Sequence, residues 1–231
     1  LLLAGDAGQR IYGGGVSLQA IGIPVRGRSY VLKVNYRTTE QIRREADRLL
    51  GEESDDMDGS QESRRGTRSL LRGPVPTFRG FATAAAERSG ALDTLRAWLG
   101  DGIPAEAIAV FARTLKQLEP LTKALHDAGL ATHALADDDE ATSARGIRLG
   151  SMHRAKGLEF RAVLVLGCGE RYLPHPAALR DLTDPSDREQ ALAGERQLLY
   201  VAMTRARERL HITCAGEPSP LLDRALWSTS T

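Results

Sequence analysis

The chain has 231 residues, of which 42% are hydrophobic, 26% charged and 5% aromatic. This composition is typical of a globular protein and excludes the disordered and fibrous classes. No apolar run approaches the roughly 18 residues that a membrane-spanning helix needs, and residues 1–4 lack the length and the basic flank of a signal peptide. We therefore expect a protein that is neither membrane-spanning nor secreted.

The acidic residues are unevenly distributed. Six lie in residues 52–62, which contain no basic residue, and four more lie in 137–140. The rest of the chain then carries a formal charge of +11, which fits either an attraction for a polyanion or an ordinary solvated surface. Cys168 and Cys214 lie far apart in apolar segments, which predicts reduced core thiols rather than a metal site. A reducing cytoplasm is the simplest setting.

The first part of the chain predicts short elements. Residues 1–4 read as a buried strand that enters a turn, and 29–34 as an alternating strand. A helix is predicted at 38–50, where a threonine cap precedes Glu40. Residues 51–69 are rich in Gly, Ser and acids, which predicts a flexible acidic loop.

From residue 75 onward the predicted elements alternate. Strands are expected at 77–81, 108–112, 132–135, 147–151, 162–166 and 210–214, and helices at 84–99, 115–128, 187–206 and 221–227. Such alternation indicates an α/β fold with a mostly parallel sheet covered by helices on both faces.

Two early segments carry candidate chemistry. Residues 5–12 read Gly-Asp-Ala-Gly-Gln-Arg-Ile-Tyr and follow a strand, where open α/β sheets bind ligands, so Gln9 could bond a phosphate or a water. Residues 35–39 read Asn-Tyr-Arg-Thr-Thr, which offers the planar fork of Arg37 for phosphate and the ring of Tyr36 for a base. An ordinary polar turn, and a buried tyrosine beside a surface arginine, are the alternatives.

A third segment, residues 151–160, reads Ser-Met-His-Arg-Ala-Lys-Gly-Leu-Glu-Phe between two apolar strands. It places a hydroxyl, an imidazole, cations and a carboxylate together, and Gly157 permits close approach of the backbone to a phosphate. Because the Gly-x-x-x-x spacing is missing before Lys156, this is not a Walker A sequence. Taken alone, His153 is more often a structural histidine.

The fourth segment, residues 195–207, has apolar residues at helical spacing. It predicts a helix whose apolar residues pack against the core and leave the Arg205 guanidinium free to reach a cleft. There the guanidinium would stabilise a transferring phosphoryl group. The alternative is a basic amphipathic helix in which Arg205 pairs with Glu195 or Glu208.

In this order, the four segments resemble motifs III, IV, V and VI of the UvrD/Rep family of superfamily 1 helicases. In that family ATP occupies a cleft between two RecA-like motor domains of the P-loop NTPase type, which move along single-stranded DNA. The resemblance implies that residues 1–36 are the tail of the first motor domain and that 37–231 are the second.

The resemblance also implies roles for individual residues. The residues expected to act on the γ-phosphate as catalytic residues are Gln9, Arg37 and Arg205. The residues expected to bind the nucleotide are Tyr36 at the adenine, Glu159 at the ribose, and Gly157. The residues expected on the nucleic-acid side are Tyr12, Ser151, His153 and Lys156.

Two departures from the family pattern matter. The chain contains no Gly-x-x-x-x-Gly-Lys-[Ser/Thr] and no Asp-Glu-x-Gln, so ATP with Mg²⁺ would need the N-terminal motor domain of the same polypeptide as a partner. Gly14 stands where the family usually has a tryptophan.

The resemblance therefore implies the C-terminal part of an ATP-dependent DNA helicase or translocase of 3′ to 5′ polarity, inactive in ATP hydrolysis on its own. The alternative is a non-catalytic nucleic-acid-binding or protein-interaction module that retains a helicase fold. The sequence encoded upstream of Leu1 would distinguish them, because an intact phosphate-loop motif there favours the enzyme.

Overall fold

The computed structural model describes residues 33–50, 53–55, 61–63, 66–135 and 145–229. The predicted site residues Gln9 and Tyr12, together with Gly14, lie outside these ranges. The strand predicted at 1–4 and most of the strand predicted at 29–34 lie outside them as well.

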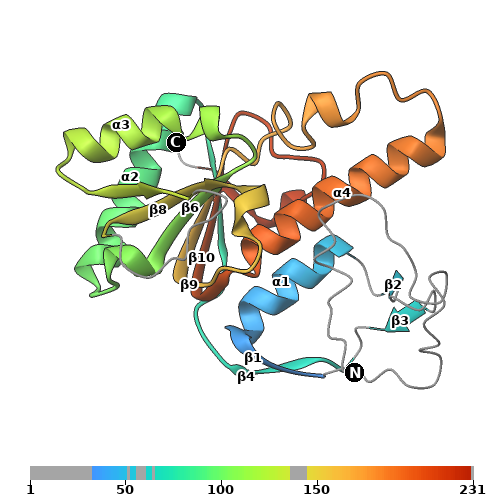
Figure 1. The fold of residues 1–231 in the computed structure, drawn as a ribbon, viewed down its shortest axis with the longest axis horizontal. Helices are drawn as coiled ribbons and strands as arrows, with labels where there is room; N and C mark the ends of the chain where they lie inside the picture. The colour runs from blue at the N-terminus through green and yellow to red at the C-terminus, as the bar shows by residue number, and fades with distance from the viewer. Residues whose placement is uncertain (1–32, 51–52, 56–60, 64–65, 136–144, 230–231) are drawn as a thin grey trace.

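A seven-stranded sheet forms the centre of the molecule (Figure 1). Its strands are β5 (Thr77–Phe81), β6 (Ile108–Ala112), β7 (Thr132–Ala134), β8 (Ile147–Ser151), β9 (Phe160–Leu166), β10 (Ala206–Ala215) and β11 (Trp227–Thr229). They lie in the order β11-β5-β10-β9-β6-β8-β7, and every neighbouring pair is parallel. The predicted parallel α/β sheet is confirmed.

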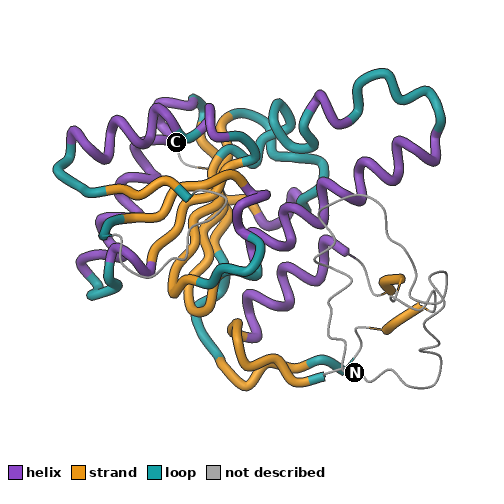
Figure 2. Tube along the Cα trace, viewed as in Figure 1, coloured by secondary structure: helices purple, strands orange, loops and turns teal. Residues whose placement is uncertain are grey.

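Helices cover both faces of this sheet, as the purple tubes of Figure 2 show. The helices are α1 (Glu40–Leu50), α2 (Ala84–Gly100), α3 (Glu119–Asp127) and α4 (Pro185–Met203). The side chains of β6 divide between two cores. Ala109 and Phe111 pack with α1 and α4, whereas Ile108, Val110 and Ala112 pack with α2 and α3. All five are buried, as expected of a central strand in a parallel sheet.

The longer helices begin where the sequence supplies a cap. The Thr83 hydroxyl accepts a hydrogen bond from the Ala86 amide at the start of α2, and the Asp184 carboxylate accepts one from the Ser186 amide at the start of α4. Pro185 occupies the first position of α4, where a missing N–H costs nothing. Local chemistry therefore fixes where both helices start.

The helix predicted at 115–128 is divided in two. Thr114 and Gln117 form a capping box around a 3₁₀ turn at Leu115–Gln117. α3 then begins with Pro120 in its first turn. Because Pro120 has no N–H to donate to the Lys116 carbonyl, the turn and the helix do not join into one hydrogen-bonded helix.

The last predicted helix, 221–227, is wrong. Asp223 caps a single 3₁₀ turn at Arg224–Leu226, and β11 follows it as the edge strand beside β5. The ring of Trp227 packs edge-on against Phe78, with 5.7 Å between centroids. Pairing with β5 and this aromatic contact outweigh the helical spacing of the segment.

Two short sheets accompany the main one. β1 (Val34–Thr39) pairs in parallel with β4 (Arg68–Leu71), and β2 (Glu53–Asp55) pairs in antiparallel with β3 (Gln61–Ser63). The predicted start of α1 at residue 38 is two residues early, because β1 continues to Thr39. β2 and β3 fall within the acidic segment 51–69, and the boundary placed between 36 and 37 falls inside β1, so that division remains a prediction.

A buried carboxylate ties α2 to the central strands. Glu87 accepts hydrogen bonds from the Gly167 amide at 2.9 Å and the Thr213 hydroxyl at 2.6 Å. Burial raises the pKa of Glu87. Burial, and next the Glu87 charge, raise the pKa of Cys168 and bring that of Cys214 to about 12. Both are free buried thiols, as predicted, and neither ionises at neutral pH.

Candidate functional site

The predicted site residues divide between two edges of the main sheet. Because its strands are parallel, their amino ends share one edge and their carboxyl ends the other. Glu159 and Arg205 directly precede β9 and β10, so they lie at what we call the amino edge. Ser151 ends β8 and Arg113 follows β6, so they lie at the carboxyl edge. β4 leads into β5 at the amino edge, toward the lower end of Figure 1.

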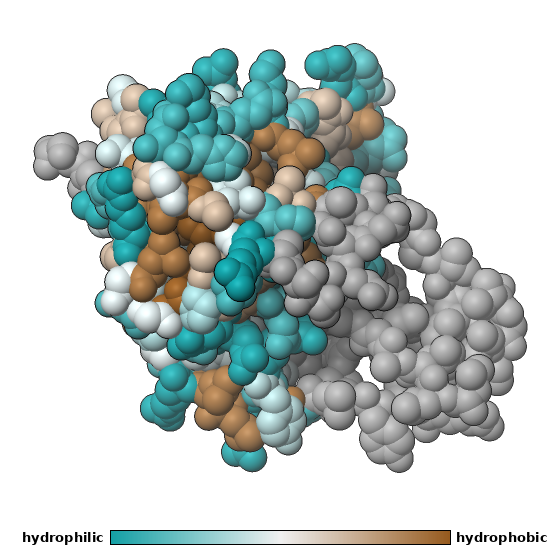
Figure 3. All heavy atoms as spheres, turned by 60° about the vertical axis from the view of Figure 1, so that its left-hand side comes forward, coloured by the Kyte–Doolittle hydropathy of each residue, from teal (hydrophilic) through white to brown (hydrophobic). Residues whose placement is uncertain are grey.

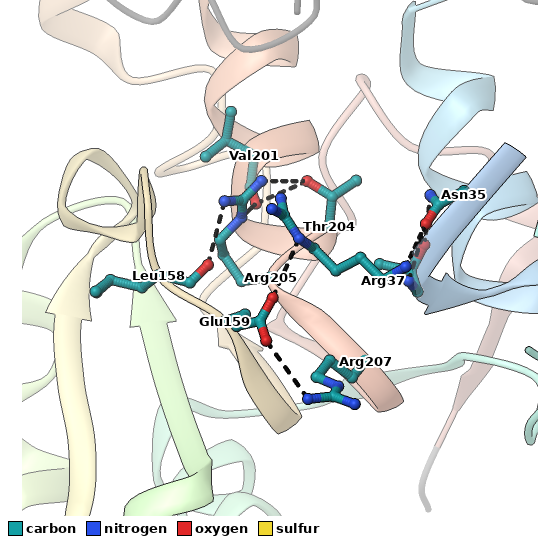
Figure 4. Close-up of polar contacts among 9 residues, drawn as sticks. Asn35, Arg37, Leu158, Glu159, Val201, Thr204, Arg205 and Arg207 are labelled. Carbon is teal, nitrogen blue, oxygen red and sulfur yellow. Dashed lines mark hydrogen bonds and ion pairs between the residues drawn. The ribbon is translucent and has the colours of Figure 1, made fainter. Parts of the chain in front are cut away.

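Glu159 is the centre of an exposed ion cluster at the amino edge. Its Oε2 lies 3.2 Å from Arg37 Nε, and its Oε1 lies 3.4 Å from Arg207 Nη1. The Arg37 and Glu159 side chains are each 47% exposed, so water screens their attraction. Figure 4 shows Arg37 reaching from β1 to Glu159, with Arg205 beside them. The structure thus brings together predicted nucleotide contacts from distant segments.

Arg205 is buried, contrary to the prediction of a free guanidinium. It is 1% exposed. Its Nε donates a hydrogen bond to the Val201 carbonyl at 3.1 Å, its Nη1 to the Leu158 carbonyl at 3.2 Å and its Nη2 to the Thr204 hydroxyl at 3.3 Å. The Arg205 carbonyl accepts a further bond from the Phe160 amide at 2.9 Å. These bonds fasten the end of α4 to the turn before β9 (Figure 4).

The two carboxylates that the sequence offered as alternative partners of Arg205 bond other arginines. Glu208 accepts two hydrogen bonds from Arg161, at 2.8 and 2.9 Å, and Glu195 bonds Arg113. Arg205 lies two residues beyond the end of α4, where the chain turns into β10. The helical spacing of the apolar residues therefore did not predict the position of the Arg205 side chain.

Asn35 shapes the segment that carries Tyr36 and Arg37. Its Oδ1 accepts hydrogen bonds from the amides of Arg37 at 2.7 Å and Thr38 at 3.1 Å, and its Nδ2 donates to the Thr38 hydroxyl at 3.0 Å. Such local bonds stabilise an irregular strand, and the pairing of β1 with β4 shifts register here. Tyr36 is 71% exposed, so its ring is accessible for stacking.

Residues 152–159 connect the two edges. The chain leaving the carboxyl end of β8 must reach the amino end of the parallel strand β9. It passes through a 3₁₀ turn at Met152–Ala155, which packs against α4, and then through the exposed Lys156 to Gly157. Gly157 has φ +85°, and no atom lies within 4 Å of the position that a Cβ would take, so backbone conformation rather than space favours glycine.

A buried ion pair stands at the carboxyl edge. Arg113 donates two arms to the Glu195 carboxylate, Nη2 at 2.7 Å and Nε at 2.9 Å, and the side chains are only 13% and 3% exposed. The His175 amide donates to the same carboxylate at 2.9 Å. Burial and then the Arg113 charge lower the pKa of His153 beside this pair, so its imidazole is neutral at pH 7.

Sequence reasoning gave Arg113 no role, and it named Glu195 only as a partner for Arg205. A signal for Arg113 was present, because it directly follows the wholly buried strand β6. Polar side chains at the carboxyl ends of parallel strands are where α/β sheets bind ligands. Ser151, half-buried at the end of the neighbouring strand β8, pairs with Ala112, the residue before Arg113.

Exposed apolar side chains gather around β1 and β4. Tyr36, Leu70 and Val75 are more than half exposed, and Leu71 is 39% exposed. Figure 3 shows hydrophobic residues, in brown, at the lower end of the molecule, where these strands lie. Such a patch marks a contact surface more often than a free one.

A cavity of about 450 Å³ opens between α2 and the strands β5 and β10, lined by Thr77, Trp98 and His211 among others. None of the predicted site residues lines it. Within the described part of the chain, no cluster of three or more His, Cys, Asp or Glu residues is placed to hold a metal ion. None of the described helices is both long and apolar enough to cross a membrane.

Part of the chain resembles known helicases. Residues 130–217 match the UvrD-like helicase C-terminal domain family. The chain is 44% identical over 82 residues to YjcD of Bacillus subtilis and 43% identical over 81 residues to the ATP-dependent DNA helicase PcrA of Staphylococcus epidermidis. These alignments cover 36% and 35% of this chain but only 10% of each relative.

A solved structure shares the fold. The C-terminal domain of a possible DNA helicase from Lactobacillus plantarum WCFS1 superposes with a TM-score of 0.60 at 24% identity, over 85% of this chain and 99% of that one. The matched residues 130–217 include the crossover 152–159 and the end of α4. The chain therefore resembles the UvrD-like helicase C-terminal domain family over residues 130–217, and it shares the fold of this solved domain.

Proposed function

We propose that this chain is the second motor domain of an ATP-dependent DNA helicase or translocase, supplying one wall of the ATP cleft and part of the single-stranded DNA track. One observation carries the proposal. Within a single sheet, Glu159 and Arg205 lie at the amino edge, and Ser151 and His153 lie at the carboxyl edge. PcrA, which this chain resembles over a short segment, is named an ATP-dependent DNA helicase.

The amino edge suits a nucleoside triphosphate. The exposed ring of Tyr36 can stack on adenine, the Glu159 carboxylate can accept hydrogen bonds from ribose hydroxyls, and the Arg37 fork matches phosphate oxygens. For ATP to bind, Glu159 must break its ion pairs with Arg37 and Arg207 and form hydrogen bonds with the ligand instead. Exposed ion pairs cost little to break, so this exchange is inexpensive. Gln9 is assigned to the γ-phosphate by the resemblance.

Arg205 contributes from a fixed position. Hydrogen bonds to the turn before β9 and to the end of α4 orient the guanidinium, and because it is 1% exposed, ATP binding must expose it to the γ-phosphate. A preorganised cation of this kind stabilises the charge that develops on a transferring phosphoryl group.

Mg²⁺ would neutralise part of the charge on the phosphates when ATP is bound. It takes oxygen ligands in near-octahedral geometry, and the described residues offer no carboxylate cluster for it. We assign its ligands, and the phosphate-cradling lysine, to an upstream motor domain in the same polypeptide. The exposed apolar surface of Tyr36, Leu70, Leu71 and Val75 is our candidate for the contact with that domain.

The carboxyl edge is our candidate for the DNA track. Ser151 offers a hydroxyl and His153 a neutral imidazole, both suited to hydrogen bonds with phosphates or base edges. Lys156 and Tyr12 join this side by the resemblance, which also gives the 3′ to 5′ polarity. The crossover 152–159 and the second half of α4 join both edges, so a displacement caused by ATP at one edge would reach the other.

The complete gene product provides the test. It should hydrolyse ATP faster in the presence of single-stranded DNA and move 3′ to 5′ along it. Arg37→Ala should abolish hydrolysis while single-stranded DNA binding remains, and His153→Ala should weaken DNA binding and DNA stimulation while ATP still binds. Lys123→Ala, which removes an exposed charge on α3, is the matched control. DNA binding without any nucleotide turnover would favour the non-catalytic module instead.

A further inference from the structure

The loop between β9 and α4 opens with a firmly held segment at the carboxyl edge, residues 167–175. Four backbone hydrogen bonds of 2.8–3.0 Å hold it. The donating amides are those of Cys168, Glu170, Tyr172 and Leu173. Leu173 is fully buried and anchors the segment in the core. Its backbone is therefore fixed independently of the side chains that it presents outward.

Tyr172 is presented to solvent from this segment. Its side chain is 37% exposed. The guanidinium of Arg171 lies over its ring, 5.5 Å from the centroid, which is within the range of a cation–π contact. A ring held by a rigid backbone and a stacked arginine loses little conformational freedom when a ligand binds.

The position of Tyr172 places it beside the proposed DNA track. The His175 amide bonds Glu195, which holds Arg113 next to His153. Three residues of chain span at most about 10 Å, so Tyr172 lies no farther than that from His175. Among the residues that the structure describes, Tyr172 is the exposed aromatic side chain at this edge, since the other exposed aromatic, Tyr36, lies in β1.

We infer that Tyr172, supported by Arg171, is a stacking platform for a base of single-stranded DNA at the carboxyl edge. This inference rests on the proposed function. An aromatic face stacks on any base, and arginine adds a cation–π contribution, so such a platform grips a strand without reading its sequence. The exposed carboxylate of Glu170 next to this pair disfavours a phosphate there, which favours a base as the group in contact.

The test measures binding of a fluorescein-labelled oligothymidylate to the 231-residue chain by anisotropy. Tyr172→Ala should weaken binding about 5- to 150-fold, the range that loss of one stacked base gives. Tyr172→Phe should stay within about 2-fold of the unaltered chain, because the ring rather than the hydroxyl makes the contact. The dependence of affinity on salt should not change in either variant, since tyrosine neutralises no phosphate.

Two controls separate stacking from other effects. A strand with abasic sites has no base to stack, so the unaltered chain and Tyr172→Ala should bind it equally. Lys123→Ala should leave binding to both oligonucleotides unchanged, because Lys123 lies on α3 and is not among the proposed DNA contacts. Photo-crosslinking with a 5-iodouracil strand should attach the nucleotide to the peptide that contains Tyr172.

The outcomes distinguish the Tyr172 platform from the proposed DNA track at the carboxyl edge. Equal binding of oligothymidylate by the unaltered chain and Tyr172→Ala, while His153→Ala binds more weakly, overturns the platform and leaves the DNA edge standing. An equal loss of affinity for normal and abasic strands in Tyr172→Ala also overturns it. If the unaltered chain binds no single-stranded DNA, both the DNA edge and the platform are overturned.

Discussion

The two edges of the sheet contain the same chemical pair in opposite surroundings. At the amino edge, Arg37 and Glu159 are each 47% exposed and meet at a single 3.2 Å contact. At the carboxyl edge, Arg113 and Glu195 are 13% and 3% exposed and meet through two arms. Exposed pairs are weak and exchange partners readily, whereas a buried pair is costly to break. One edge can therefore rearrange around a ligand, while the other is built in advance.

Arg205 is expected to give the largest effect, because it holds the end of α4 in place and is also our proposed contact for the γ-phosphate. In the complete gene product, Arg205→Ala should slow single-turnover ATP hydrolysis by about 10³ to 10⁵, as loss of an arginine finger does. It should also lower the free energy of unfolding by about 2 kcal/mol, because the Leu158 and Val201 carbonyls lose a donor. Quenched single-turnover assays measure the rate of ATP hydrolysis, and urea denaturation measures the free energy of unfolding.

Arg205→Lys is the matched control for this prediction. Lysine keeps the charge but loses the planar fork, so we expect little recovery of hydrolysis. A variant Arg205→Ala that is less stable yet hydrolyses ATP at a near-normal rate would show that Arg205 only fastens α4 to the turn before β9.

Glu195→Ala tests the buried side of the comparison. It leaves the Arg113 guanidinium buried without its carboxylate, and it removes the acceptor of the His175 amide. We expect the free energy of unfolding to fall by about 3–5 kcal/mol in urea denaturation of the 231-residue chain. Replacing both members, Arg113→Met with Glu195→Leu, should cost less than Glu195→Ala alone. A single variant as stable as the unaltered chain would contradict a prebuilt carboxyl edge.

Acid should destabilise the interior between the edges through His211. Burial, and next the Arg79 charge, lower the pKa of His211 from 6.5 to about 4. Between about pH 6.5 and 4 the His211 imidazole is therefore protonated in the unfolded chain but neutral in the folded chain. The free energy of unfolding falls as the pH drops through this range. The contribution at pH 4 is about 3 kcal/mol. His211→Asn, which can still bond Thr77, should lose this part of the pH dependence, and an unchanged profile would exclude His211 as its source.

The sequence predicted the centre of the fold well because its signals are local. The observed bounds of β5, β6 and β8 are those predicted, since short runs of strand-forming residues end at polar residues and turns. It failed at β11, whose strand conformation depends on pairing with β5, a segment far away in the sequence. An edge strand of three residues leaves too little pattern to outweigh helical spacing.

The sequence named the residues of the candidate site but did not predict their contacts. Glu159 and Arg37 were both named, yet nothing in either segment shows that they meet. Arg205 was expected to be free because its helix has an apolar face, but the carbonyl that bonds its Nη1 belongs to Leu158 in another segment. The pairing of Arg113 with Glu195 likewise joins two distant segments. Contacts of this kind arise from topology, which local patterns do not encode.

The smallest expected effect belongs to Glu159→Ala, the counterpart of Glu195→Ala at the exposed edge. Because water already solvates the Arg37 and Glu159 side chains, removing the carboxylate should change the free energy of unfolding by less than about 0.5 kcal/mol. If Glu159 binds ribose, the same variant should raise KM for ATP in the complete gene product, and Glu159→Gln should recover part of the affinity because its amide oxygen still accepts a hydrogen bond. Urea denaturation of both alanine variants side by side measures the contrast directly. A loss at Glu159 as large as the loss at Glu195 would show that the amino edge is as rigid as the carboxyl edge, and that the ion cluster holds the fold rather than waiting for a ligand.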